Sequence, residues 1–184
     1  SLTFTTGNWD TPQTVTVTGV DNDVAGSNAG STITLAVNDD SSDANYDALS
    51  DQTVTAALTD NDTAGFTKST SSVTVTEAAG GSNTATFTVV LDSEPSSGTV
   101  VIDVTSGTTG QATVSPSSLT FTTGNWDTPQ TVTVTGVADG VVDGDDPTTI
   151  TLSINQAGTV ADYDGVASQT VTATTTNPWG FTKS

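Results

Sequence analysis

Cysteine, methionine, histidine and arginine are all absent from this 184-residue chain, and Lys68 and Lys183 are its only lysines. Without cysteine or histidine the chain has no disulfide framework, no zinc site built from those ligands, no thiol nucleophile and no imidazole base. No apolar run approaches the roughly 18 residues that a membrane-spanning helix needs. These absences exclude most of the common catalytic arrangements and argue against membrane insertion.

The charge of the chain is almost entirely of one sign. Aspartate and glutamate number 21 against 2 basic residues, which gives a formal net charge of −19. Nucleic acid is excluded as a partner because nothing could neutralise its phosphates, and anionic membrane surfaces are disfavoured for the same reason. Such a charge suits a solvated surface or sites for cations.

What the sequence does contain is a long internal repeat. The block SLTFTTGNWDTPQTVTVTGV fills residues 1–20 and again residues 118–137, which is a spacing of 117 positions. Shorter matches continue at this spacing as far as the QTVT at 52–55, and the GFTKS at 65–69 returns at 180–184. Copies of this length are typical of strings of like domains, which more often span distance or present a surface than carry out chemistry.

The repeat divides the chain into three predicted segments. Residues 1–64 are the C-terminal half of one repeat, residues 65–179 are a complete repeat, and residues 180–184 begin the next. We expect the chain to be an interior excerpt of a longer array, or one piece of a domain completed elsewhere. The half-repeat alone would expose one face and several strand edges. We therefore expect it to be completed by its upstream neighbour or by another chain.

Alternation of threonine with apolar residues is the dominant local pattern, as in the TVTVT of residues 131–135. Period two with β-branched residues predicts half-buried strands, and no stretch has helical periodicity. In the complete repeat we predict eight strands, at 71–77, 83–91, 99–105, 111–115, 118–122, 130–137, 148–154 and 168–176. The half-repeat should hold the last four of them. Short strands at this spacing favour an all-β, two-sheet antiparallel sandwich.

The apolar face of these strands predicts the core. It should consist of Val73, Val75, Phe87, Val89, Leu91, Ile102, Val104, Leu119, Phe121, Val132, Val134, Ile150, Leu152 and Val171. The turn GNWDTP joins two of the strands in each copy. Its tryptophans, Trp9 and Trp126, are expected to plug the end of the sandwich beneath the turn.

Several motifs follow one another in a recognisable order. VTVTE at 73–77 precedes TATFTVVL at 84–91, then come SLTFTTG at 118–124, an acidic loop at 138–146 and TITLSI at 149–154. This order resembles the Calx-β domain, in particular the versions strung along giant bacterial surface adhesins that carry repeats-in-toxin (RTX) ends. The resemblance implies an immunoglobulin-like sandwich that binds calcium at one tip.

The resemblance also implies a set of calcium ligands, carried over position by position. The set comprises a glutamate that ends the first strand, acids of the loop at 138–146, and acids at the corresponding loop and closing triplet of the first module. These residues are Glu77, Asp139, Asp143, Asp145, Asp146, Asp60, Asp62, Asp21 and Asp23. The second module retains only Asn177 of its closing triplet, so one site per module or fewer is expected.

The chemistry of the acidic clusters also favours calcium. Calcium is a hard cation that takes six to eight oxygen ligands, many of them carboxylates. Residues 60–62 and 139–146 place several carboxylates within short loops, where like charges repel by about 1 kcal/mol per pair at 4 Å even in bulk water. The alternative is that these residues only form turns. We favour that alternative for Asp39, Asp40, Asp43, Asp47, Asp162 and Asp164.

The sequence therefore predicts a calcium-stabilised spacer module of an extracellular adhesin on the bacterial cell surface, whose partners are neighbouring repeats. Direct binding of a glycan, ice or a protein partner is the alternative, because the Thr-Val-Thr arrays offer a threonine face and Trp9 and Trp126 could stack on sugar rings. An enzyme is disfavoured. A pair such as Asp143 and Asp145 could in principle serve glycoside hydrolysis, but the repeat architecture argues against it.

Overall fold

The computed structural model describes residues 1–26, 30–77, 83–141 and 144–177. Within this part of the chain the secondary structure consists of eleven strands and three short 3-10 helices. The chain forms two compact units. Unit 1 comprises Ser1–Asn22 and Asn28–Asp60, and unit 2 comprises Asp23–Ser27 and Asn61–Ser184.

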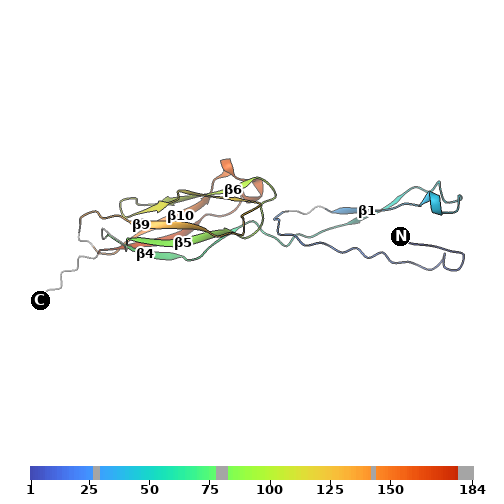
Figure 1. The fold of residues 1–184 in the computed structure, drawn as a ribbon, viewed down its shortest axis with the longest axis horizontal. Coiled ribbons are helices and arrows are strands. Elements are labelled where there is room, and N and C mark those ends of the chain that lie inside the picture. The colour runs from blue at the N-terminus through green and yellow to red at the C-terminus, as the bar shows by residue number, and fades with distance from the viewer. Residues whose placement is uncertain (27–29, 78–82, 142–143, 178–184) are drawn as a thin grey trace. The chain divides into compact units, whose positions relative to one another are not determined.

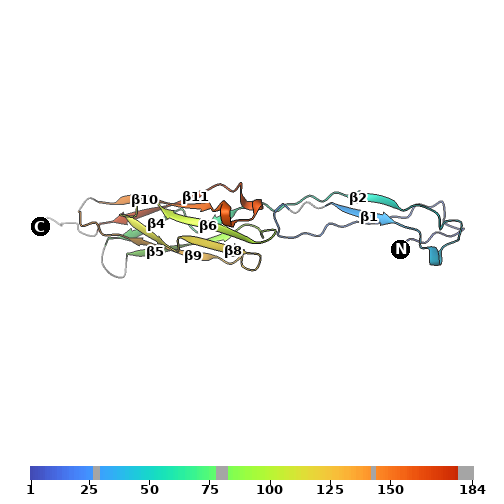
Figure 2. The ribbon, with the colours of Figure 1, turned by 90° about the horizontal axis from the view of Figure 1, so that it is seen from above.

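Unit 2 is a sandwich of two β-sheets, and Figure 2 labels most of its strands. One sheet has the order β4-β11-β10-β6-β8 and the other the order β3-β5-β9-β7. All the pairings are antiparallel except that of β4 with β11. The strands are β3 (Phe66–Lys68), β4 (Ser72–Thr76), β5 (Thr84–Leu91), β6 (Thr99–Ser106), β7 (Ala112–Ser115), β8 (Ser118–Thr122), β9 (Gln130–Gly136), β10 (Asp146–Ile154) and β11 (Gln169–Thr176). This arrangement confirms the predicted antiparallel, immunoglobulin-like sandwich.

All eight strands predicted for the complete repeat are present, with ends that lie within two residues of the prediction. The strand that was missed is β3, whose three residues are too few to show an alternating pattern. The predicted core is also buried, with the exception of Val73, which is half-buried. The core additionally contains Phe66, Val100, Ala112, Tyr163 and Ala173. Each large apolar side chain buried here contributes about 1.5–3 kcal/mol.

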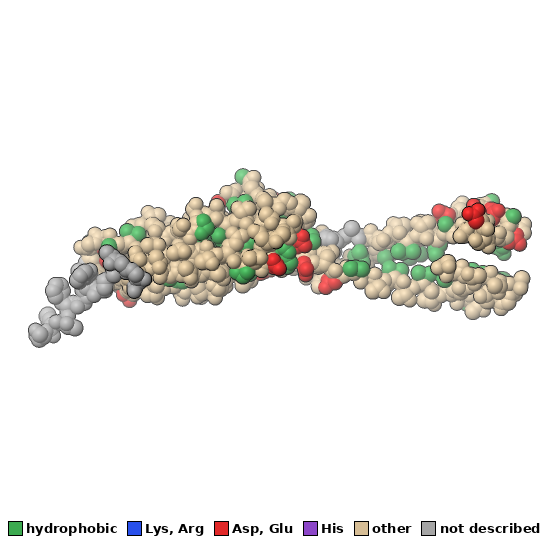
Figure 3. Space-filling view, in the orientation of Figure 1, with side chains coloured by type: hydrophobic (Ala, Val, Ile, Leu, Met, Phe, Trp, Pro, Cys, Tyr) green, Lys and Arg blue, Asp and Glu red, His purple; other side chains and the backbone are tan. Residues whose placement is uncertain are grey.

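Unit 1 contains far less regular structure. Its described residues form one antiparallel hairpin of β1 (Ser31–Leu35) and β2 (Gln52–Ala56), with the 3-10 helix η1 (Asp39–Ser41) between them (Figure 1). Many apolar side chains are exposed, and Figure 3 shows hydrophobic groups along this unit. The exposed residues are Leu2, Phe4, Trp9, Val15, Val17, Val20, Leu35, Tyr46, Leu49, Val54 and Leu58.

The prediction of four strands in the half-repeat is therefore wrong, and the pairing of the strands explains why. In unit 2, β10 pairs with β11, and both have counterparts in unit 1, namely β1 and β2. By contrast, β8 pairs with β6, and β9 pairs with β5 and β7. Residues 1–60 contain no counterparts of β5, β6 or β7, so the copies of β8 and β9 have no partner to form a ladder with.

The two tryptophans of the repeated turn have different environments. Trp126 is half-buried and packs against the core of unit 2, as expected of a plug beneath the turn. Trp9 is 72% exposed, so the same expectation is wrong for the first copy. The tryptophan is covered only where the sandwich is complete.

Candidate functional site

Glu77 lies at the end of the five-stranded sheet where β4 and β11 finish and β10 starts. Thr76 is in register with Thr176 in the parallel pairing, and the amide of Glu77 donates to the carbonyl of Thr176 at 3.1 Å. On the other side of β11, Asp146 is in register with Thr175. Glu77 and Asp146 therefore lie at the same end of the sheet, with β11 between them. Glu77 is 7% exposed.

The loop after β9 carries the second predicted group of ligands to the same end. The amide of Val141 donates to Asp139 Oδ1 at 2.8 Å, and Asn177 Nδ2 donates to the carbonyl of Val141 at 2.6 Å. The loop is thereby held against the residue that follows β11. Asp139 and Asp145 are exposed and Asp146 is half-buried, whereas Asp143 lies outside the described residues.

The structure divides the predicted ligands of the first module between the two units. Asp21 and Asp60 belong to unit 1, and Asp23 belongs to unit 2 together with Asp62. The carbonyl of Asp23 accepts from the amide of Glu94 at 2.7 Å, beside a parallel bridge between Val24 and Glu94. This backbone contact fixes the segment of Asp23 without using its carboxylate.

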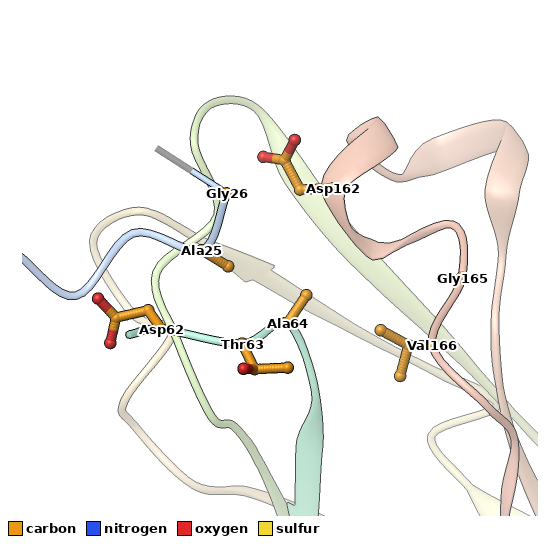
Figure 4. Close-up of a pocket in the computed structure, with 8 residues that line it drawn as sticks. All are labelled: Ala25, Gly26, Asp62, Thr63, Ala64, Asp162, Gly165 and Val166. Carbon is orange, nitrogen blue, oxygen red and sulfur yellow. The ribbon is translucent and has the colours of Figure 1, made fainter. Parts of the chain in front are cut away.

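An open pocket of about 370 Å³ lies in unit 2 where the segment of Asp23 contacts the sandwich (Figure 4). Its lining is formed by Ala25, Gly26, Asp62, Thr63, Ala64, Asp162, Gly165 and Val166. Ala25 is buried. Asp162 Oδ2 accepts from the amide of Ser96 at 3.3 Å, a contact between residues far apart in the sequence. Among the described residues that line the pocket, the polar side chains are the carboxylates of Asp62 and Asp162 and the hydroxyl of Thr63, and none is cationic.

A buried polar pair that the sequence analysis missed lies in the same unit. The hydroxyl of Tyr163 donates to the carbonyl of Ser93, and Tyr163 Oη and Ser93 Oγ are 3.0 Å apart. Tyr163 has no exposed surface, and burial raises its pKa above the ordinary value of 10.0, partly opposed by the hydrogen bonds to Ser93. The sequence feature that could have drawn attention to Tyr163 is that the repeat places a tyrosine at both 46 and 163. The pair joins the segment before β11 to the loop after β5.

Within the described ranges, no group of three or more Asp, Glu, His or Cys side chains is placed so that it could hold a metal ion. The calcium ligands inferred from the resemblance therefore stay predictions. The described part of the chain also has no helix that is both long and apolar enough to cross a membrane.

Comparisons with known proteins give structural similarities only. No protein-family model matches the chain, and a search of curated proteins found no match. The chain resembles the E. coli chaperone DraB with 10% identity and a TM-score of 0.44. The match covers 61% of this chain and 55% of that one. For the periplasmic chaperone SfaE the identity is 9% and the TM-score 0.43, over 65% of this chain and 60% of that one. The chain thus spans little more than half the length of these two proteins.

The apo-form Calx CBD1 domain is similar at 17% identity and a TM-score of 0.44. The match covers 63% of this chain and 98% of that domain. The fold assignment given above rests on the pairing of the strands within this chain.

Proposed function

We propose that this chain is a calcium-stabilised extender of a long bacterial cell-surface adhesin, which projects a ligand-binding region away from the cell. The observation that carries the proposal is the parallel pairing of β4 with β11. Because the first and last strands of that sheet run in the same direction, the chain enters the sandwich at one end and leaves it at the other.

This geometry suits a module in a string. An antiparallel pairing of the first and last strands would return the chain to the end where it entered, and successive modules would then fold back on one another. With parallel strands, each repeat advances the chain by at least the length of β11. That strand has eight residues, which corresponds to about 26 Å at the usual rise per residue. The long sequence repeat supplies the other requirement, because it indicates more than one such module.

Calcium would be held at the end of the sandwich where the chain leaves. The residues that fit are Glu77, Asp139, Asp146 and Asn177, which all offer oxygen atoms of the kind that calcium prefers. Glu77 is largely buried at this end of the sandwich. Lys68, the only lysine in the described part of the chain, is in register with Val89 near the opposite end of β5. Bound calcium would supply positive charge at an end that carries acidic side chains.

The first test of the calcium role is a thermal melt of the chain in calcium, in magnesium and in chelator. Binding to the folded state alone would stabilise it by about 2.7 kcal/mol at one hundred times the dissociation constant. We expect a rise in melting temperature in calcium only, and its loss in Glu77→Gln. The matched control is Asp40→Asn, an exposed acid of unit 1, which should keep the full response. An equal response in Glu77→Gln, or none in the unchanged chain, would contradict the role of this site.

The spacer role is tested by small-angle scattering of chains with two, three and four copies of residues 65–179. The maximum dimension should increase by a constant amount per copy, of at least about 26 Å, and it should shrink in chelator. A maximum dimension that does not grow with copy number would refute extension. Equal dimensions with and without calcium would refute only the stiffening by the ion.

A further inference from the structure

The block that occurs twice in the sequence has two different environments. In residues 118–137 it supplies β8 and β9, whose inward side chains are fully or almost fully buried. In residues 1–20 the same letters form no strand, and the same four apolar side chains are exposed. The buried set is Leu119, Phe121, Val132 and Val134, and the exposed set is Leu2, Phe4, Val15 and Val17.

The hairpin of unit 1 already has the pairing that the complete sandwich requires. Ser31 is paired with Ala56, Ile33 with Val54, and Leu35 with Gln52. Adding 117 to each number gives the pairing of Thr148 with Ala173, Ile150 with Val171, and Leu152 with Gln169 in unit 2. The register is the same along the whole ladder. Unit 1 therefore holds two strands of a sandwich in their final register while Leu35 and Val54 remain exposed.

Unit 2 shows which segments cover these surfaces when they are complete. The free edge of β10 is covered by β6, and the free edge of β11 by β4. β5 and β7 lie on either side of β9, and β6 pairs with β8. Every covering strand comes from residues 66–115. One continuous segment thus covers all the surfaces that are exposed in unit 1.

We propose that residues 1–60 form an acceptor for strands, and that their occupant is a second copy of the segment at residues 65–117. The register follows from unit 2 by subtracting 117 from one partner. Donor Ile102 would pair with Leu2, and donor Phe87 with Val15. Donor Val104 would pair with Leu35, and donor Val73 with Ala56. Residues 1–5 and 13–19 would then become strands.

An exchange of donor segments between two copies of residues 1–184 does not supply this occupant. Residues 1–184 contain one donor segment, residues 65–117, but two acceptor segments, residues 1–60 and 118–176. If two chains exchanged donors, each donor would leave one acceptor to cover another, and the number of covered acceptors would stay the same. Only an additional donor increases that number. Association of identical chains therefore gives no gain in buried apolar surface by this pairing.

The test adds the donor to the chain as it stands. Residues 65–117 are placed directly before Ser1, so that their last residue joins Ser1 as Ser117 joins Ser118. Amide hydrogen exchange is then measured by mass spectrometry for residues 1–60, with and without the added segment. Because peptides from 1–20 and 118–137 have equal masses, an exposed Thr18→Ser substitution marks the first copy. A control chain carries Phe87→Asp and Val104→Asp in the added segment alone.

We expect exchange at residues 13–19 and 31–35 to slow on the order of 100-fold or more in the extended chain. The control should keep the fast exchange of the original chain. Peptides from β9 and β10 report in the same sample whether unit 2 is folded. Fast exchange at 13–19 in the extended chain, with unit 2 protected, would overturn the proposal. So would slow exchange in the original chain accompanied by a dimer in sedimentation, because the occupant would then be a second whole chain.

This inference goes beyond the extender role and does not need calcium. The exchange experiment is therefore done both in calcium and in chelator. Protection in chelator would support strand complementation even if the calcium role failed. A calcium-dependent melting temperature, without protection of residues 13–19 from exchange in the extended chain, would support the calcium site and contradict the acceptor role of residues 1–60.

Discussion

Residues 1–20 and 118–137 are the same sequence in one chain, and the comparison separates what local sequence determines from what the tertiary structure adds. The turn is the same in both copies. Asn8 Oδ1 accepts from Thr5 Oγ1 at 3.0 Å, and Asn125 Oδ1 accepts from Thr122 Oγ1 at 3.0 Å. The hydrogen bonds of the turn are formed among neighbouring residues, so the turn does not depend on the rest of the sandwich.

The strands that flank the turn differ between the two copies. β8 and β9 exist because β5, β6 and β7 supply the opposite side of each ladder. In the first copy those partners are missing, and the alternating TVTVT pattern remains outside any strand. The preference of these residues for strands is thus a preference for a paired and half-buried surface. The hairpin β1-β2 persists because both of its strands lie in the same segment.

The largest expected difference between the copies is in the core. Phe121 is fully buried, whereas Phe4 is 53% exposed. Phe121→Ala should lower the free energy of unfolding of unit 2 by about 3–5 kcal/mol, while Phe4→Ala should change it by less than about 0.5 kcal/mol. Urea unfolding of the two variants measures both values. Similar losses in the two variants would show that the first copy has a core of its own.

Two glycines at matching positions give the second contrast. A Cβ on Gly136 would lie 2.5 Å from the carbonyl oxygen of Thr76, whereas a Cβ on Gly19 would meet Leu58 Cδ2 at 3.5 Å, an ordinary contact. Gly136→Ala should destabilise unit 2 by about 1–3 kcal/mol because the backbone of β4 must move. Gly19→Ala should be close to neutral, which thermal melts of the two variants would check. A neutral Gly136→Ala would argue against the close approach of β4 to β9.

The repeated tyrosines form the third pair. Tyr163 is buried with its hydroxyl bonded to Ser93, and Tyr46 is 57% exposed. Tyr163→Phe leaves the buried carbonyl of Ser93 without this donor, so it should lower the stability of unit 2 by about 1–2 kcal/mol. Tyr46→Phe should have almost no effect. Urea unfolding at neutral pH distinguishes the two, and equal effects would contradict the assigned contact.

The burial of Tyr163 also predicts how the stability of unit 2 changes at high pH. Its folded pKa is raised by burial, so the folded state holds the proton more tightly than the unfolded state does. The resulting stabilisation is fully present below pH 10 and is lost as the pH rises through the raised pKa. Tyr163→Phe should therefore remove part of the fall in stability above pH 10. An unchanged alkaline profile would show that Tyr163 does not titrate in this way.

The smallest effect is expected at the turn, where the two copies should behave alike. Asn8→Ala and Asn125→Ala each remove the side-chain oxygen that caps Thr5 or Thr122. Each loss should weaken its own turn by about 1 kcal/mol. The amide proton of the capped threonine, followed by nuclear magnetic resonance, should shift and exchange faster in both variants. An effect on Thr122 alone would show that the turn of the first copy depends on a complete sandwich.

The same comparison shows how far sequence reasoning extends. Alternation predicted the eight strands of the complete repeat and almost all of its core. It does so because each strand of a two-sheet sandwich has one face toward solvent and one face buried in the core. The half-repeat was predicted wrongly because alternation reports which side chains could be buried but not whether a partner strand is present. The burial of Tyr163 was missed because its segment between β10 and β11 has no periodic pattern.

The candidate site was predictable only in part. The resemblance named Glu77 and the acids of the loop at 138–146, and the structure brings Glu77 and Asp146 to one end of the sheet. The role of Asn177, which holds the Asp139 loop through the carbonyl of Val141, depends on a contact between residues far apart in sequence. Such a contact leaves no signal in the local pattern.

We expect this sequence to form strands only where its partner strands are present. Amide hydrogen exchange of the chain that carries only Thr18→Ser, which marks the first copy, compares the two copies in one sample. Amides of residues 130–136 should exchange slowly, as in a closed ladder, while those of residues 13–19 should exchange nearly as fast as in an unfolded peptide. Equal protection of the two copies would show that strand formation does not depend on the partner strands.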